Sequence, residues 1–506
     1  MQKQIIILLI LFSTIFARGN NEFIKHKIDS THKAIVGAST SISKDSIITL
    51  YEIIYKLAES NNLYDKQIEI LISKARIANV YFDLTLLNTN IYQADSIFNQ
   101  HASQLEANDR ENLFFNINYF KGIYMNRMYD FQKAIEHFQM LADKIKLKTP
   151  QDSNRYYNIL AYTADCYSSL QNHHKSLEIY LYAKNFISKG IYHDYYLANN
   201  YSHLGELFNA IREVSHDNKY PDLAKEYLSK AMSLLEHIPD ENALLLMHLR
   251  LSDIYLSENN LDSALQILMA AEEFYSFQQV GKSDIQFQIG KVFNLKNDFN
   301  NAINRFLSAS NILKKEFLNV KNRRKSEVHS ETANTYVMKG SYSLALSHIQ
   351  KAITNIVADF DNTNVEVLPG LKNILSESHL LEALKIKGNI WFAIYQQDND
   401  LRALQHSIAC FDLAFDLIDK MRNNFQSADY KSYIADKATS IYENAIDVAY
   451  TALQNGQDQE KYTQLIYQYL ERNKSRLLLQ SMASANSRQF AGVPDSIISQ
   501  ERDYLR

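Results

Sequence analysis

The segment Leu246–Phe274 constrains the fold of this chain most strongly, because variants of it recur from about residue 70 to about residue 420. It predicts two antiparallel helices joined by a polar turn at 257–260. Small residues let two helices approach closely, and large residues fill the space beside them. Both kinds recur here at helical spacing: Leu251, Ser252 and Tyr255, then Ala264, Leu268 and Ala271. Neither helix can bury its apolar stripe alone, so the pattern predicts an all-α solenoid of stacked antiparallel helix pairs.

The same pattern marks further helix pairs on both sides of this segment. On its N-terminal side the residues are Ala78, Tyr81, Ala94, Phe98 and Ala102; Gly122, Ala134, Phe138 and Leu141; Ala164, Tyr167, Ser176, Tyr180 and Ala183; and Gly205, Phe208, Ala224, Leu228 and Ala231. On its C-terminal side they are Gly290, Phe293, Ala302 and Phe306; Ala333, Tyr336, Ala345, Ile349 and Ala352; and Gly388, Phe392, Ser407, Phe411 and Ala414. An extra segment at 211–220 precedes Pro221, which can open a helix at little cost.

Length and composition agree with a helical solenoid. A chain of 506 residues can form one such array, because a solenoid grows by adding repeats. The sequence is 46% hydrophobic, and its 12 Gly and 5 Pro provide few breaks between helices. The 33 Tyr and 25 Phe are therefore expected to act mainly as large core residues between helices.

Charge, cysteine and histidine content exclude several kinds of site. The 53 basic and 57 acidic residues give a net charge of −4, so no global field favours a nucleic-acid partner. Cys166 and Cys410 lie in distant repeats and are expected to be small core residues without a disulfide. The adjacent His173 and His174 cannot face one metal ion from a helix, and no paired metal-ligand motif occurs. We expect neither a metal nor a cofactor.

The N-terminus has the features of an export signal. Lys3 precedes the apolar run Ile5–Phe16, which is long enough for a signal-peptide core but short for a bilayer span. We expect cleavage after Gly19, with cleavage after Ala17 as the near alternative, and an uncleaved anchor or a buried first helix as a third possibility. Cleavage would leave no membrane span and an exported protein, periplasmic or at the surface of a bacterium.

The expected domain order follows from these features. A signal peptide at 1–19 is followed by a polar linker at 20–46. The repeat solenoid occupies 47–420, and a helical extension occupies 421–506.

The repeated residues resemble the tetratricopeptide repeat. That family has a small residue and then an aromatic residue in the first helix, followed by Ala, a bulky residue and Ala in the second. Equivalent alanines lie about 38 to 48 residues apart here, compared with the standard period of about 34, which implies longer helices. The resemblance implies a right-handed solenoid with a concave groove that binds a protein or peptide and performs no catalysis.

A narrower resemblance appears toward the C-terminus. The segments are Val357–Asp361, Leu380–Gly388, Phe411–Ile418, Leu470–Leu479, Val493–Ser496 and Glu501–Arg506. Their order resembles the junction between tetratricopeptide repeats and a caspase-like CHAT domain in bacterial proteins. This resemblance implies the sensory or regulatory arm of a truncated protease, because the sequence has no CHAT strands or catalytic His/Cys pair. Cys410 lies within a repeat helix, with no neighbouring base evident.

Asparagines recur at two positions of the predicted first helices. Positions six residues before and four residues after the small residue should face the groove. These positions hold Asn116, Asn158 and Asn199, and Asn126, Asn209 and Asn294, respectively. An asparagine amide both donates and accepts hydrogen bonds, so this ladder could bind the backbone of an extended peptide. Asparagine is abundant throughout the chain, so chance placement on a solvated face is the competing interpretation.

Two function classes follow from the sequence. The first is an exported scaffold that binds a protein or peptide partner. The second is an all-helical enzyme with a pocket formed across repeats, although no acid pair, nucleophile triad or phosphate loop is legible. We therefore expect a protein that is not an enzyme. A transmembrane sensor is disfavoured because the sequence has no second apolar span.

Overall fold

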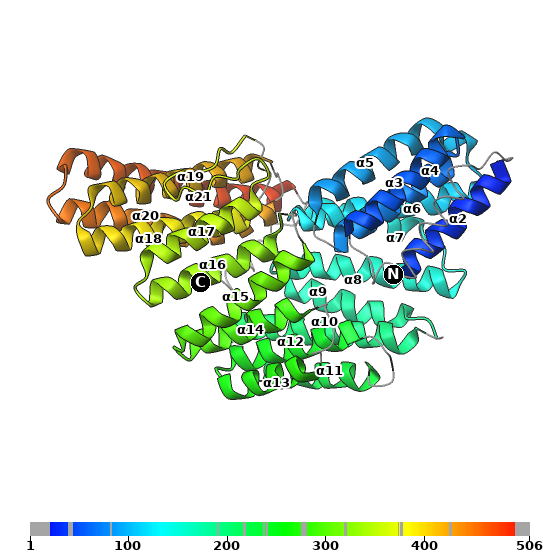
Figure 1. The fold of residues 1–506 in the computed structure, drawn as a ribbon, viewed down its shortest axis with the longest axis horizontal. Helices are drawn as coiled ribbons and strands as arrows, with labels where there is room; N and C mark the ends of the chain where they lie inside the picture. The colour runs from blue at the N-terminus through cyan, green and yellow to red at the C-terminus, as the bar shows by residue number, and fades with distance from the viewer. Residues whose placement is uncertain are drawn as a thin grey trace. The chain divides into compact units, whose positions relative to one another are not determined.

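The computed structural model describes most of the chain. The described residues are 21–38, 44–80, 83–189, 192–215, 219–235, 238, 241–274, 281–317, 321–372, 374, 378–424 and 428–490. In these ranges every regular element is a helix, which confirms the all-α solenoid class (Figure 1). The expected signal peptide and its cleavage site lie outside them, as do Tyr81 and residues 491–506. No helix in the described part of the chain is long and apolar enough to cross a membrane.

The chain divides into two compact units. The first unit contains residues up to Arg127 and Lys133–Cys166, and the second contains Met128–Gln132 and the chain from Tyr167 onward. The helices up to the boundary are α2 (Asn21–Ala38), α3 (Lys44–Ser60), α4 (Tyr64–Val80), α5 (Leu84–His101), the 3₁₀ turn η1 (Ala102–Gln104) and α6 (Ala107–Arg127). Both α7 (Phe131–Lys144) and α8 (Pro150–Ser169) have residues in each unit.

Helix α2 occupies much of the stretch that was expected to be a linker. Ile24, Ile28 and Ile35 are each 1% exposed and form one buried stripe. Salt bridges of 2.9 Å from Lys25 to Asp65 and from Lys66 to Asp29 also join α2 to α4. The sequence prediction of a linker relied on the polar composition of 20–46. A helix at the surface of an array can be mostly polar, because it needs only about one apolar residue per turn to pack.

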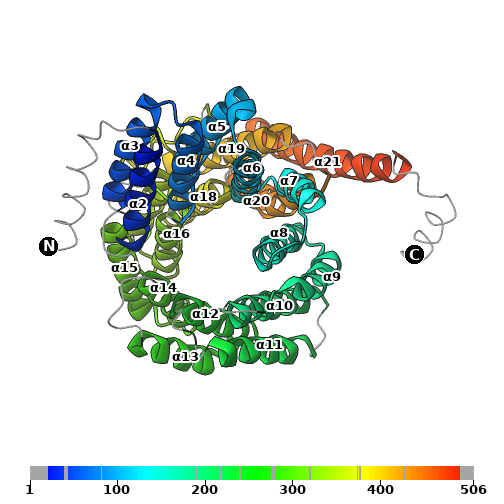
Figure 2. The same cartoon turned by 90° about the vertical axis from the view of Figure 1, so that its right-hand side faces the viewer.

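The second unit continues the antiparallel pairs. Its elements are α9 (His173–Ala183), the 3₁₀ turn η2 (Lys184–Phe186), α10 (His193–Ser215), α11 (Lys219–Leu235), α12 (Glu241–Ser257), α13 (Leu261–Phe274), α14 (Lys282–Leu295), α15 (Phe299–Glu316), α16 (Arg323–Met338), α17 (Tyr342–Ile356), α18 (Ser378–Asp398), α19 (Leu401–Asn424), α20 (Ala428–Gln454) and α21 (Gln459–Phe490). Even-numbered helices come first in each pair and odd-numbered helices come second. Figure 2 shows α10, α12 and α14 in one layer of this unit and α11 and α13 in the other.

The turn inside a pair uses the same local chemistry in successive repeats. Asn259 and Asn297 adopt the left-handed conformation, with φ of 58° and 60°, which asparagine tolerates better than most residues. The next residue then caps the second helix through its side chain. Asn260 Oδ1 accepts a hydrogen bond from Ser263 N, and Asp298 Oδ1 accepts one from Asn301 N, both at 3.2 Å.

Close approach of paired helices explains the small residues of the repeat pattern. A Cβ atom added to Gly290 would lie 2.6 Å from Cε1 of Phe306, which is closer than packing allows. The predicted partners also meet in three other pairs: Gly122 with Phe138, Gly205 with Leu228, and Gly388 with Phe411. The structure therefore confirms the predicted register of small and large residues in these pairs.

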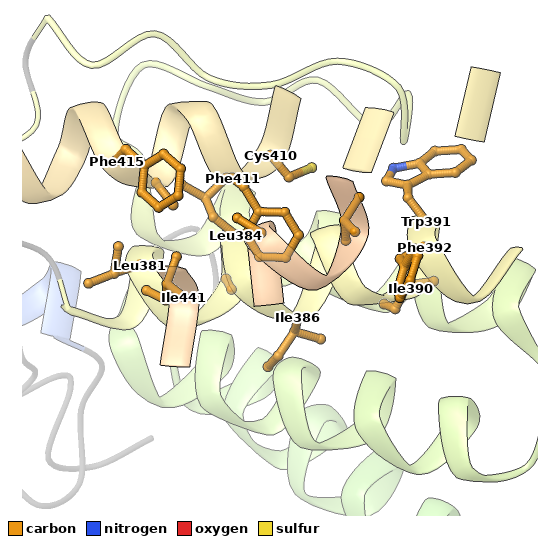
Figure 3. Packing of buried hydrophobic residues seen from close by; sticks show 14 of the residues in the cluster. Leu381, Leu384, Ile386, Ile390, Trp391, Phe392, Cys410, Phe411, Phe415 and Ile441 are labelled. Atoms are coloured by element: carbon orange, nitrogen blue, oxygen red, sulfur yellow. The ribbon is translucent and has the colours of Figure 1, made fainter. Parts of the chain in front are cut away.

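The hydrophobic core continues beyond residue 420. Figure 3 shows Phe411 and Phe415 of α19 packed among residues of α18 and Ile441 of α20. The ring of Phe415 stacks on Tyr442 of α20 at 4.4 Å, and Tyr469 of α21 contacts the same ring edge-on. The expected helical extension is thus a further helix pair, α20 and α21, which shares the core of the preceding pair.

Candidate functional site

Polar side chains join neighbouring even-numbered helices, and we call the surface that these helices share in each unit the first-helix face. Successive first helices of the second unit contact one another directly, from α10 to α20. Side chains cross-link neighbours: Ser257 Oγ donates to Asn209 Oδ1 at 2.9 Å, and Gln288 Nε2 donates to Asp253 Oδ1 at 3.0 Å. Arg324 forms a salt bridge with Asp284 of the preceding first helix. Some of the polar side chains on this face therefore bind adjacent repeats to each other.

Two of the three asparagines four residues after the small residue have structural partners. Asn126 Nδ2 donates to the sulfur of Cys166 in the next first helix at 3.1 Å, and Asn209 accepts from Ser257 as described. Asn294 is half-buried, and its Oδ1 atom has no hydrogen-bond partner in the described part of the chain. The structure thus gives Asn126 and Asn209 a role between repeats that spacing alone did not reveal.

The asparagines six residues before the small residue are the more available set. Asn116 and Asn158 lie in the first unit, and Asn199 lies in the second. All three are half-buried, and their side chains form no hydrogen bond with the described residues. No contact brings these three amides together. Their binding role remains a prediction.

Asn116 lines a cavity of about 410 Å³ formed by α2, α4 and α6 of the first unit. The carboxylates of Asp29 and Glu69 each lie 2.9 Å from the Lys66 ammonium, so this part of the cavity is internally paired. Arg76 also lines the cavity and faces the Phe120 ring at 6.0 Å. This cavity presents both signs of charge.

A cavity of about 320 Å³ lies among α16, α18 and α20 on the first-helix face of the second unit. Glu327 and Glu331 of α16 line it, and neither forms an ion pair within the described residues. Burial raises the pKa of Glu331, and Glu327 and Glu382 act in the same direction, whereas Lys291 opposes them. Sequence reasoning missed this site, because the spacing of Glu327 and Glu331 is visible but the approach of Glu382 from α18 is not.

The cysteines lack the features of nucleophiles. Burial raises the pKa of both Cys166 and Cys410 to about 12, so both thiols stay protonated near neutral pH. Within the described ranges, no group of three or more His, Cys, Asp or Glu side chains gathers as a metal site.

Comparisons with known proteins support a repeat fold. Residues 161–323 match the family model for the tetratricopeptide repeat-like domain, so the central part of the chain contains such a domain. No curated protein matches the chain.

Several solved structures are similar at low identity. A Rap protein complexed with competence and sporulation factor is 12% identical and covers 83% of this chain and 99% of its own, with a TM-score of 0.41. The apo form of the quorum sensor NprR from B. thuringiensis is 12% identical and covers 80% and 99%, also with a TM-score of 0.41. BtubC from P. vanneervenii is 12% identical and covers 59% and 92%, with a TM-score of 0.31.

Proposed function

We propose that this chain is a scaffold that binds a protein or peptide partner along its first-helix face. The observation that carries the proposal is the set of polar side chains on that face without internal partners. Asn158 and Asn199 have unbonded amides, and Glu327 and Glu331 have unpaired carboxylates, within the described residues. The two amides and Glu331 are half-buried, whereas Glu327 is exposed. Half-buried polar groups gain from a partner that supplies hydrogen bonds, because they are already partly removed from water.

The chemistry of these groups suits an extended polypeptide. A side-chain amide can pair with both the N–H and the C=O of a peptide backbone, whatever the sequence of that peptide. Carboxylates can then select for cationic side chains. Binding, not catalysis, is the proposed activity, and the protonated buried thiols of Cys166 and Cys410 support this choice.

We further propose that the scaffold is exported and acts as the sensory arm of a CHAT-type protease. The run Ile5–Phe16 after Lys3 supports export, and the segment order from Val357–Asp361 onward supports the second part. N-terminal sequencing of the protein from its host should begin near Asn20. A soluble cytoplasmic product that retains Met1 would contradict export.

Site-directed photo-crosslinking tests the binding face. A photoreactive residue at Asn199, on first helix α10, should capture a partner in host extract, whereas one at Asn304, exposed on second helix α15, should not. Equal capture from both positions, or capture only from Asn304, would refute binding on the first-helix face.

An alanine series then measures the amides. The triple variant Asn116→Ala, Asn158→Ala and Asn199→Ala should retain its helical content and weaken binding of the captured partner by at least about 1 kcal/mol, or about fivefold. The matched control removes exposed asparagines from second helices: Asn99→Ala, Asn304→Ala and Asn311→Ala. The asparagine hypothesis predicts unchanged affinity in this control, and it is wrong if the two triple variants bind alike.

A further inference from the structure

Three carboxylates and one ammonium group line the cavity among α16, α18 and α20. Glu327 and Glu331 lie one turn apart on α16 without ion pairs in the described part of the chain. Glu382 reaches the same cavity from α18, where it pairs at 2.8 Å with Lys385 of its own helix. Two of the three carboxylates therefore have no ion pair within the described residues; Glu327 is exposed and Glu331 is half-buried.

Two positive groups lie near the cavity, and neither forms an ion pair with Glu327 or Glu331. Lys291 of α14 acts on Glu331 across the face, yet burial prevails and the pKa of Glu331 is raised. Lys437 of α20 also lines the cavity, and its side chain is exposed. A partly buried carboxylate without a close cation is costly, because the protein replaces the water that would solvate it.

Ser326 supplies an independent sign that something belongs in the cavity. This residue lines the cavity and is 1% exposed, yet its Oγ atom has no hydrogen-bond partner within the described residues. Buried hydroxyl groups are usually satisfied, and leaving one unpaired costs about 1–3 kcal/mol. A hydroxyl oxygen can accept a hydrogen bond from an N–H donor.

We propose that this cavity binds a lysine or arginine side chain of the partner segment on the first-helix face. The inference rests on the proposed binding function and names the side-chain chemistry that one part of the face selects. An ammonium or guanidinium group carries several donors, so it can serve the carboxylates of Glu327 and Glu331 and the hydroxyl of Ser326 together. The cavity of about 320 Å³ is at the small end of ligand pockets, which suits one side chain better than a large ligand.

The cavity belongs to the same surface as the proposed peptide site, which is why we assign the cation to a polypeptide and not to a free amine. Asn199 lies on α10 and the cavity on α16 to α20, and successive first helices between them contact one another. A bound segment could therefore follow the face and insert one cationic side chain.

Peptide selection tests this assignment with the full chain. A library of random peptides displayed on phage is selected on the wild-type protein, on the variant Glu327→Gln with Glu331→Gln, and on the control Glu136→Gln with Glu273→Gln. The control removes the same charge from exposed glutamates of second helices. Wild type and control should enrich peptides with Lys or Arg at one fixed position, and the cavity variant should not.

Binding constants of one selected peptide complete the test. Replacing its cationic residue by norleucine or citrulline should weaken binding to the wild type at least tenfold and leave binding to the cavity variant unchanged. Circular dichroism must show that both variants retain their helix content. Spermidine serves as the free-amine probe, and micromolar spermidine that displaces no peptide supports the assignment.

The remaining outcomes would contradict the cation site, the proposed binding function or the polypeptide source of the cation, as follows. Peptides that crosslink to position 199 but show no preference for Lys or Arg would refute the cation site and leave the proposed function standing. No peptide on the first-helix face would refute both. Micromolar spermidine that binds the wild type but not the cavity variant, without a cationic preference among peptides, would assign the cavity to a free amine and overturn the polypeptide source.

Discussion

The pairs α12–α15 and α16–α19 share one backbone pattern but have different interiors. The buried cluster formed by α12, α13 and α14 is aliphatic and includes Ala264, Leu268 and Ile289, all 0% exposed. Between α16 and α19 the interior contains titratable and amide side chains as well. Lys387 is 0% exposed and Gln350 is 1% exposed, and His348 is 7% exposed.

The polar interior of α16–α19 accompanies a long connection between α17 and α18. Gln350 Nε2 donates to the carbonyl oxygen of Asn362 at 2.7 Å, and Lys387 Nζ donates to Gln350 Oε1 at 2.7 Å and to the carbonyl oxygen of Val367 at 3.2 Å. The buried side chains of Gln350 and Lys387 thus donate hydrogen bonds to carbonyl groups of this loop, which receive none from the backbone of a helix or a sheet within the described residues. In both regions the small and large residues set the geometry of the helix pair. Where a long loop packs on the pair, polar side chains are also buried, because they bond to the backbone of the loop.

The largest expected effect is a charge placed inside the aliphatic pair. Ala264→Arg puts a long cation where α12 and α13 touch, so overpacking and an unpaired buried charge should destabilise the protein on the order of several kcal/mol. Urea unfolding measures the loss. The control Gln266→Arg places the same residue at an exposed position of the same helix and should change little. Coincident unfolding curves for Ala264→Arg and the parent would show that the register is wrong.

The histidines of α16 and α17 should make their pair more sensitive to acid than the aliphatic pair. The His329 and His348 rings lie 5.4 Å apart, and burial lowers their pKa values from 6.5 to about 3 and about 4. Their positive neighbours Lys351 and Lys325 act in the same direction. Between about pH 6.5 and 4 the unfolded chain therefore binds more protons than the folded one.

The free energy of unfolding is therefore unaffected by these histidines above about pH 6.5, where both are neutral in the folded and the unfolded chain. It falls as the pH decreases below that value. The loss is up to about 1.4 kcal/mol per pH unit for each histidine. Urea unfolding at pH 7 and pH 5 measures it, and the variant His329→Gln with His348→Gln should show a shallower dependence. An unchanged slope in that variant would mean that other groups govern acid sensitivity.

The fold was largely predictable because its main determinant is local. Gly290 and Phe306 lie only 16 residues apart, as do Gly122 and Phe138. Gly205 and Leu228, and Gly388 and Phe411, lie 23 residues apart, which is still within one helix pair. Helix α2 was missed, because its isolated isoleucines can be recognised as a buried stripe only once the neighbouring helix α3 is in place. Contacts between repeats are likewise hard to predict, because they depend on helices that are far apart in the sequence.

The candidate site was less predictable than the fold. The sequence predicts that Asn209 binds a partner, but it does not reveal that Asn209 Oδ1 accepts a hydrogen bond from Ser257 of the next first helix at 2.9 Å. That contact depends on how two pairs stack, and this angle depends on many residues at once. The cavity around Glu331 depends likewise on α18 and α20, which follow a long loop in the sequence.

A smaller effect is expected from the close approaches that the two regions share. Gly290→Ala places a Cβ atom 2.6 Å from the Phe306 ring, and Gly388→Ala places one 2.9 Å from the Phe411 ring. Strain of about 1–3 kcal/mol should outweigh the helix propensity gained from alanine, about 1 kcal/mol, and the loss should be greater at position 290. Thermal unfolding measures both. Gly37→Ala, with no atom within 4 Å of the new Cβ, is the control and should not destabilise the protein.

The smallest expected difference concerns the caps of the second helices. Asp298 caps α15 by accepting a hydrogen bond from Asn301 N at 3.2 Å, whereas Ser341, the corresponding residue before α17, makes no side-chain cap bond. Asp298→Ala should therefore lower the stability by about 1 kcal/mol, and Ser341→Ala should lower it by only about a few tenths of a kcal/mol. Amide hydrogen exchange at the start of α15 and α17 would resolve the two, because the effect is local to the first turn. Equal losses would show that Ser341 caps α17 in solution, which would remove this difference between the two regions.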